Sequence, residues 1–174
     1  MSTRSTVIVK GQEEYGRDTE YIRAYKHSDG YPTGNLPIIA KAIQRLNSIY
    51  SEYIVHFGDN RTKIIPESLM ALFVGESVNV YGVGAIVEQT TKNIKEASGK
   101  RYDVEWTYVL DIDNKNVEVY SSNKIEKCTT NPEEYVMQIT KDYQQSELRK
   151  IKEAVRSIQI LGWTVNTVAL DLTK

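Results

Sequence analysis

The segment that decides the fold is Tyr25-Lys26-His27-Ser28-Asp29-Gly30-Tyr31-Pro32-Thr33-Gly34-Asn35-Leu36-Pro37. Polar and apolar residues alternate before it, as in a strand, and apolar residues follow it at helical spacing. Asp29-Gly30 is a strong turn signal, because the carboxylate can accept hydrogen bonds from nearby N–H groups and glycine tolerates positive φ. Asn35 is predicted to cap the following helix, with Pro37 in the first turn. The segment is therefore predicted to join a strand to a helix through a tight corner.

Upstream of this corner, the chain is predicted to form a β-hairpin. Its first strand, 6–10, is rich in β-branched residues, and its second, 19–27, alternates. Alternation in the second strand places four side chains on one face, Tyr21, Arg23, Tyr25 and His27, and three on the other, Ile22, Ala24 and Lys26. The hairpin therefore aims a guanidinium, a phenol and an imidazole toward the same side.

Downstream of the corner, the pattern predicts further helices and a second hairpin. The predicted helices cover about 36–52, 66–74, 131–139 and 146–161. The predicted strands cover 102–112 and 117–120, with a short one at 124–128 and a closing one at 163–172, and 77–89 is predicted as an irregular strand or a buried loop. Together they predict a single α+β domain over residues 1–174, with an antiparallel sheet built from hairpins and three or four helices packed on it.

Composition limits the classes of function. The chain has 174 residues, a net charge of -1 and one cysteine, Cys128. The near-neutral charge argues against sequence-independent nucleic-acid binding, and a single cysteine fits a reducing compartment. The N-terminus lacks the apolar core of a signal peptide, and no apolar run is long enough to span a membrane. We therefore expect a cytoplasmic protein that does not contact a membrane.

Tyrosine is unusually common, with 12 copies against 2 phenylalanines. Tyrosine offers a large stacking surface together with a hydroxyl group. One interpretation of this composition is a sheet with a tyrosine-rich surface. The other, with cations near the corner, is a pocket for a flat, negatively charged ligand, in which arginine would hold a phosphate or carboxylate. A core position is the alternative to stacking for Trp106 and Tyr108. The predicted ligand-binding residues are Arg4, Ser5, Arg23, Tyr25, His27, Asp29, Tyr31, Trp106 and Tyr108.

His27 and Asp29 are the candidates for catalysis if the protein is an enzyme, with His27 as the acid–base group and Asp29 orienting the imidazole. The alternative is that Asp29 caps its own turn while His27 closes the hairpin edge. The sequence contains no complete Gly-x-Gly-x-x-Gly motif, no phosphate-binding lysine loop, and too few histidines and cysteines for a zinc site. We therefore expect no metal and no cofactor, which favours binding over catalysis.

The N-terminus and the corner each carry a distinctive motif. The chain opens Met1-Ser2-Thr3-Arg4-Ser5, and the corner reads Tyr25-Lys26-His27-Ser28-Asp29-Gly30-Tyr31-Pro32. In this the chain resembles a group of uncharacterised phage and prophage proteins that begin Met-x-Thr-Arg-Ser and carry a Tyr-x-His-x-Asp-Gly-Tyr-Pro turn. The resemblance extends to the hairpin at 102–120. Ser28 stands where many relatives have tryptophan, which removes one stacking ring. The resemblance implies a phage-type α+β protein and supplies no activity or ligand.

Three functions are compatible with the sequence. The first is a non-enzymatic binder of a small anionic, aromatic ligand such as a cyclic nucleotide or an ADP-ribose derivative. In a phage setting, such a binder would act as a sponge that sequesters a nucleotide immune signal of the host. The second is a protein–protein inhibitor that adds an edge strand to a partner. The third is a metal-independent nucleotide-cleaving enzyme that uses His27. A homo-oligomer is compatible with each.

Overall fold

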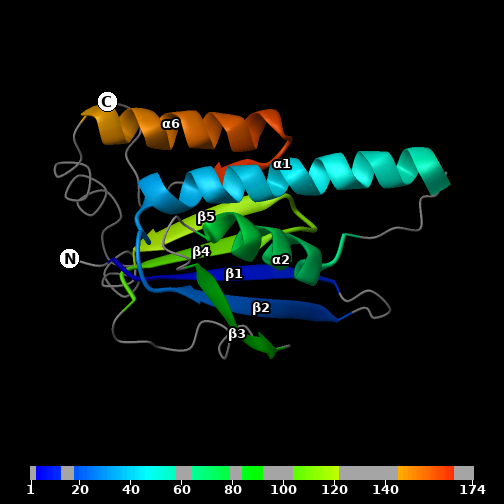
Figure 1. The fold of residues 1–174 in the computed structure, drawn as a ribbon, viewed down its shortest axis with the longest axis horizontal. Helices are drawn as coiled ribbons and strands as arrows, with labels where there is room; N and C mark the ends of the chain where they lie inside the picture. The colour runs from blue at the N-terminus through cyan, green and yellow to red at the C-terminus, as the bar shows by residue number, and fades with distance from the viewer. Residues whose placement is uncertain are drawn as a thin grey trace.

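The computed structural model describes residues 3–12, 18–57, 64–78, 84–91, 104–121 and 145–166. Three helices in these ranges lie on one side of a six-stranded sheet, which is an α+β fold as predicted (Figure 1). The elements are β1 (Ser5–Gln12), β2 (Thr19–Lys26), α1 (Pro32–Phe57), α2 (Pro66–Ser77), β3 (Ala85–Thr91), β4 (Trp106–Asp111), β5 (Asn116–Ser121), α6 (Gln145–Ile160) and β6 (Thr164–Asn166).

The sheet is mixed, so the prediction of a purely antiparallel sheet was wrong. Its strand order is β3-β2-β1-β4-β5-β6. The two predicted hairpins, β1–β2 and β4–β5, are antiparallel, whereas β1 pairs with β4 in parallel and β5 pairs with β6 in parallel. These parallel pairs join strands separated by helices, because a chain that crosses over through a helix returns in the same direction. Local alternation indicates a strand but not the direction of its distant neighbour.

Several predicted boundaries also differ from the structure. Helix α1 begins at Pro32, four residues before the predicted start, because proline is well suited to a first helical position. Asn35 therefore lies inside α1 and is not its cap. Helix α6 begins at Gln145, one residue before the predicted start. The predicted strand at 124–128 and helix at 131–139 lie outside the described residues, as does the end of the predicted closing strand.

The main core lies between the helices and one face of the sheet. The core-facing sheet residues include Val7 and Val9 of β1, Ile22 and Ala24 of β2, and Tyr108 of β4. A smaller cluster on the opposite face is centred on Ile8 and Val109, with Tyr21 and Tyr120 packed against it. The predicted alternation of β2 is therefore confirmed.

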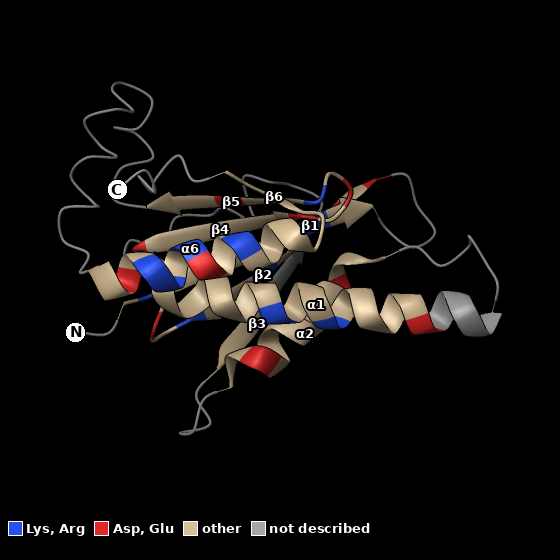
Figure 2. Cartoon of the chain, turned by 90° about the horizontal axis from the view of Figure 1, so that it is seen from above, with Lys and Arg blue, Asp and Glu red and all other residues tan. Residues whose placement is uncertain are grey.

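The outer surface of the helical layer carries both signs of charge. Lysine, arginine and acidic residues mix along α6 and α1 in the view from above (Figure 2). No helix in the described ranges has the combination of length and apolar character needed to cross a membrane. A site for a charged ligand on this layer therefore has to arise from a local arrangement of side chains.

Candidate functional site

The corner between β2 and α1 packs directly onto the start of β1. The Gly30 N–H donates to the Thr3 carbonyl oxygen at 2.9 Å, and the Gly30 carbonyl oxygen accepts a hydrogen bond from the Tyr108 hydroxyl at 2.8 Å. A Cβ atom at position 30 would lie 2.8 Å from the carbonyl carbon of Arg4 and from the Thr3 oxygen. This close approach of two backbones requires glycine, and it fixes the corner against the sheet.

Asn35 connects the parts of the corner through its side-chain amide. Its side chain is completely buried, and its Nδ2 donates to Ser5 Oγ at 2.8 Å and to the Gly30 carbonyl oxygen at 3.4 Å. Its Oδ1 accepts a hydrogen bond from Lys26 Nζ at 3.1 Å. Since the amide group is used for these long-range bonds, it is not available for the capping role that the sequence predicted.

Lys26 is a buried lysine whose contacts in the described structure are neutral oxygens. It is only 4% exposed, and besides Asn35 its Nζ donates to the Asp29 carbonyl oxygen at 3.2 Å. No acidic side chain in the described ranges forms an ion pair with it at 4.0 Å or less. Burial therefore lowers the pKa of Lys26, and the more distant charge of the Asp29 carboxylate only partly opposes this effect.

Beside Lys26 lies a cavity of about 280 Å³. It is bounded by the corner, the first turns of α1, the end of α2 and one lysine of α6. Its lining residues are Lys26, Asp29, Tyr31, Thr33, Gly34, Ile38, Glu76, Ser77, Val78 and Lys150. We refer to it as the corner cavity. Its volume is close to the lower end of the range of about 300–1,000 Å³ that is usual for small-molecule sites.

The charged residues that line the corner cavity carry both signs. Of the two acidic side chains, Glu76 is bound by Arg45, with Nη1 and Oε1 2.7 Å apart. Lys26, Lys150 and Asp29 are the other charged residues of the lining. The two lysines balance the two carboxylates of the lining. When Arg45, the partner of Glu76, is included, the group has a net charge of +1. The N-terminal end of α1 adds a positive partial charge at the same place, because Thr33 and Gly34 belong to its first turn.

Four of the predicted site residues lie at the corner, in different environments. Asp29 and Tyr31 line the cavity, and Tyr31 is 39% exposed. Ser5 is completely buried, and its hydroxyl accepts the Asn35 hydrogen bond. Ser5 pairs with Lys26, so Arg4 lies at the end of the hairpin where His27 lies. Only Asp29 and Tyr31 of the predicted set therefore face the cavity.

Tyr25, His27 and Arg23 do not line the corner cavity. The Tyr25 hydroxyl and His27 Nδ1 lie 3.2 Å apart, and their rings are in edge contact with centroids 6.2 Å apart. Arg23 joins β2 to β3 through an ion pair with Glu88, with Nε and Oε2 3.3 Å apart. These three side chains therefore do not meet at the corner cavity, because alternation places them on the face of β2 that points away from the helices.

Trp106 and Tyr108 belong to the core and do not form a stacking surface. They are 6% and 0% exposed, and both face the helices from β4. The Tyr108 hydroxyl donates to Gly30, so the residue supports the corner from below. The core alternative that the sequence left open is the arrangement that the structure shows for both residues.

Of the ten residues that line the cavity, only Asp29 and Tyr31 were predicted, and Lys26 and Lys150 are the two lysines missing from the predicted set. Alternation places Lys26 on the face of Ile22 and Ala24, and a lysine on an apolar face is a signal that could have indicated it. Lys150 comes from α6, more than a hundred residues further along the chain. No local pattern could bring it to the corner.

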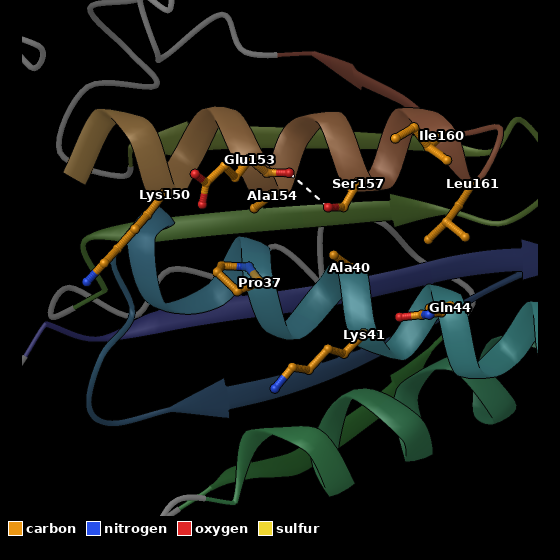
Figure 3. Close-up of a pocket in the computed structure, with 10 residues that line it drawn as sticks. All are labelled: Pro37, Ala40, Lys41, Gln44, Lys150, Glu153, Ala154, Ser157, Ile160 and Leu161. Carbon is orange, nitrogen blue, oxygen red and sulfur yellow. Dashed lines mark hydrogen bonds between the residues drawn. The ribbon is translucent and has the colours of Figure 1, made fainter. Parts of the chain in front are cut away.

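A second hollow lies between α1 and α6 and has a volume of about 460 Å³ (Figure 3). It is lined by Pro37, Ala40, Lys41, Gln44, Lys150, Glu153, Ala154, Ser157, Ile160 and Leu161. Lys150 belongs to the lining of both hollows, which makes them neighbours. In Figure 3 its side chain reaches from α6 toward the start of α1. This second hollow lacks a buried polar group comparable with Lys26 among its lining residues.

Comparison of the chain with known protein families, with characterised proteins and with solved structures gave no significant match. Within the described ranges, no group of three or more histidine, cysteine, aspartate or glutamate side chains is arranged to hold a metal ion. The resemblance to phage proteins therefore stays a prediction, and function has to be argued from the corner cavity.

Proposed function

We propose that the protein is a non-enzymatic binder of a small anionic ligand with a flat ring, and that the ligand occupies the corner cavity. In a phage setting it would act as a sponge for a nucleotide immune signal of the host. The observation that carries the proposal is the buried Lys26, which lines the cavity and is held there by neutral oxygens. The proposal keeps the predicted ligand class and moves it from the Tyr25 side of β2 to the Lys26 side.

The ammonium group of Lys26 has three N–H donors, and two of them point to Asp29 and Asn35. The third is left for a guest in the cavity. A hydrogen bond between this donor and an anion is charge-assisted, and such bonds contribute about 1.5–3 kcal/mol. Binding an anion would also compensate the buried positive charge, which neutral oxygens stabilise only in part.

The remaining lining residues suit the other parts of such a ligand. Lys150 and the first turn of α1 offer a second positive site for a phosphate or carboxylate. Tyr31 offers a partly exposed ring beside the cavity, on which a base could stack. The volume of about 280 Å³ suits a mononucleotide or one half of a larger ligand. A cyclic dinucleotide would therefore extend into the neighbouring hollow beside Lys150.

Isothermal titration calorimetry with AMP, ADP-ribose and cyclic dinucleotides tests the proposal. Lys150→Met removes an exposed charge, and we expect it to weaken binding about fivefold, which corresponds to about 1 kcal/mol. Lys26→Met is expected to abolish measurable binding. For AMP, which is small enough to stay in the corner cavity, Lys41→Met is the matched control, because Lys41 lines the hollow between α1 and α6 and not the corner cavity. No heat with any ligand, or equal weakening of AMP binding by Lys41→Met, would contradict the proposal.

Chromatography of the recovered ligand separates binding from turnover. A sponge returns the ligand intact. A product that disappears in His27→Ala would instead support the third function, an enzyme that uses His27. The contact between Tyr25 and His27 gives that imidazole a hydrogen-bond partner 3.2 Å from its Nδ1, on the other side of β2 from the cavity.

A specific observation also favours the second function, an inhibitor that adds a strand to a partner. In the described sheet, β3 is an edge strand, and its side chains Ile86 and Val87 are 67% and 48% exposed. An exposed apolar edge strand is a template for pairing with another chain. Ile86→Lys should abolish retention of a stoichiometric partner from host lysate and leave nucleotide binding unchanged. Retention by the variant would argue against this function.

A further inference from the structure

We propose that Lys26 captures ligands that carry a carbonyl group, by forming an imine inside the corner cavity. This inference deepens the proposed function and rests on it, because it names small anionic aldehydes and ketones as a ligand class of the same site. It starts from the hydrogen bonds of Lys26 and from the position of the residue at the cavity wall.

A neutral lysine amine has two N–H groups and one lone pair. In this structure two acceptors, the Asp29 carbonyl oxygen and Asn35 Oδ1, lie 3.2 Å and 3.1 Å from Nζ. If the neutral amine donates one hydrogen to each, the lone pair occupies the remaining tetrahedral position. When the Lys26 amine is charged, this position carries the third N–H, which can donate to an anion. When the amine is neutral, the same position carries the lone pair, which can act as a nucleophile.

The environment of Lys26 increases the fraction of neutral amine. Both of its acceptors are neutral oxygens, and burial lowers its pKa. The other titratable groups that line the cavity are Asp29, Tyr31, Glu76 and Lys150. Of these, the Asp29 carboxylate favours the charged form of Lys26, and Glu76 is engaged by Arg45.

The reaction is balanced without an oxidant or reductant. The Nζ lone pair forms a bond with the carbonyl carbon, and the carbonyl π electrons move to oxygen. That oxygen takes the two protons that leave nitrogen and departs as water while the C=N bond forms. Asn35 Oδ1 can retain one N–H if the imine is protonated, so the corner keeps part of its hydrogen bonding.

Pyridoxal 5′-phosphate is a suitable probe because it combines a flat ring, a phosphate and an aldehyde. Pyridoxine 5′-phosphate is its matched control, since it has an alcohol in place of the aldehyde and cannot form an imine. The full chain is incubated with limiting aldehyde and treated with borohydride, whose hydride adds to the imine carbon and makes the adduct permanent. Digestion and mass spectrometry then locate the label on individual lysines.

We expect at least tenfold more label on Lys26 than on Lys41 or Lys150. The expectation is decisive because accessibility alone predicts the opposite order: Lys26 is 4% exposed, whereas the other two are exposed. Excess pyridoxine 5′-phosphate should protect Lys26 by competition. Lys26→Arg keeps the charge and should lose the preferred site, and the distribution of label in the unaltered chain decides the matter even if that variant does not fold.

The outcomes separate the two proposals. If pyridoxine 5′-phosphate binds in calorimetry with Lys26-dependent affinity while the label follows exposure, the anion site stands and the imine inference is overturned. If the alcohol neither binds nor protects and the label again follows exposure, both proposals fall. Preferential, competable labelling of Lys26 supports both.

Discussion

Two lysines on neighbouring strands, Lys10 half-buried and Lys26 buried, differ in the partner of the amine. Lys10 lies near the end of β1, and its Nζ is 2.8 Å from Asp111 Oδ2. Lys26 ends β2 at the opposite end of the hairpin, where its acceptors are an amide and a backbone carbonyl.

Burial lowers the pKa of both lysines, but at Lys10 the hydrogen bond and charge of Asp111 outweigh burial, so the pKa is raised. A carboxylate makes the first lysine a fixed structural cation. At the second lysine the acceptors are neutral oxygens, so burial lowers the pKa.

The largest expected effect comes from breaking the corner with Gly30→Ala. The new methyl group would overlap the backbone of Arg4 and Thr3. We expect a loss of about 3 kcal/mol in the free energy of unfolding, at the upper end for overpacking. Urea denaturation measures it. Gly75→Ala is the matched control, because a Cβ there meets nothing within 4 Å and alanine stabilises a helix by about 0.5–1 kcal/mol. Equal effects in the two variants would contradict the close approach at Gly30.

The contrast between the two lysines explains what the sequence could and could not predict. Alternation in β2 correctly separated Lys26 from Tyr25 and His27. The sequence predicts a ligand on the Tyr25 side, because arginine, histidine and tyrosine are common ligand contacts, whereas the proposed site lies on the Lys26 side. The burial of Lys26 depends on Asn35, which a local pattern identifies only as a helix cap.

Long-range pairing limited the prediction of the fold in the same way. The parallel pairing of β1 with β4 joins residues about a hundred positions apart, such as Ser5 and Trp106. Both strands were visible in the sequence as alternating segments. Their relative direction depends on the helices that pass between them, which fill the space above the sheet. The α+β class and the two hairpins were therefore predictable from local patterns, whereas the parallel direction of distant strands was not, and no local pattern indicates a cavity that several elements share.

A second variant makes the corner resemble the other end of the hairpin. Asn35→Asp places a carboxylate at the acceptor of Lys26, so the pKa of Lys26 should rise toward the behaviour of Lys10. Loss of the Nδ2 donor to Ser5 and Gly30 should lower stability by about 2 kcal/mol. Nuclear magnetic resonance titration measures the pKa. An unchanged pKa of Lys26 in this variant would show that the neutral acceptors do not determine that pKa.

The reciprocal variant, Asp111→Asn, makes the other end resemble the corner. The Asn114 N–H can still donate to the side-chain oxygen at position 111, but Lys10 loses its carboxylate. We expect a loss of about 1–2 kcal/mol at neutral pH, measured by urea denaturation, and a lower pKa for Lys10. Asp113→Asn in the same exposed turn is the control and should stay within about 0.5 kcal/mol. A similar loss in the control would argue against the ion pair.

The dependence of stability on acid pH gives a further test of the role of Asp111. Burial raises the pKa of Asp111, but the hydrogen bonds from Asn114 and Lys10 outweigh it and lower the pKa below 3.8. Its stabilising contribution is therefore present above pH 3.8 and is lost as the pH falls through the folded-state value. The stability difference between the unaltered chain and Asp111→Asn should shrink in that range. A difference that persists at lower pH would contradict the lowered pKa.

The smallest effect is expected on the alkaline side and concerns Lys26. Its folded pKa lies below 10.5, so the unfolded chain binds more protons between the two values. Stability relative to Lys26→Met should therefore rise with pH in this window. Lys10 does not interfere, because its raised pKa removes stability only above 10.5. If the stability difference between the unaltered chain and Lys26→Met does not change with pH in this window, the lowered pKa of Lys26 is contradicted.

The most direct test of the central claim is a titration of the lysine side chains, followed through the Cε and Nζ resonances of isotopically labelled protein. The account predicts that Lys26 titrates below 10.5 and Lys10 above it. Added AMP should raise the pKa of Lys26 and leave that of Lys10 unchanged, because the anion sits beside one amine only. Coincident titration of the two lysines, or a Lys26 pKa that does not respond to AMP, would contradict an anion site in the corner cavity.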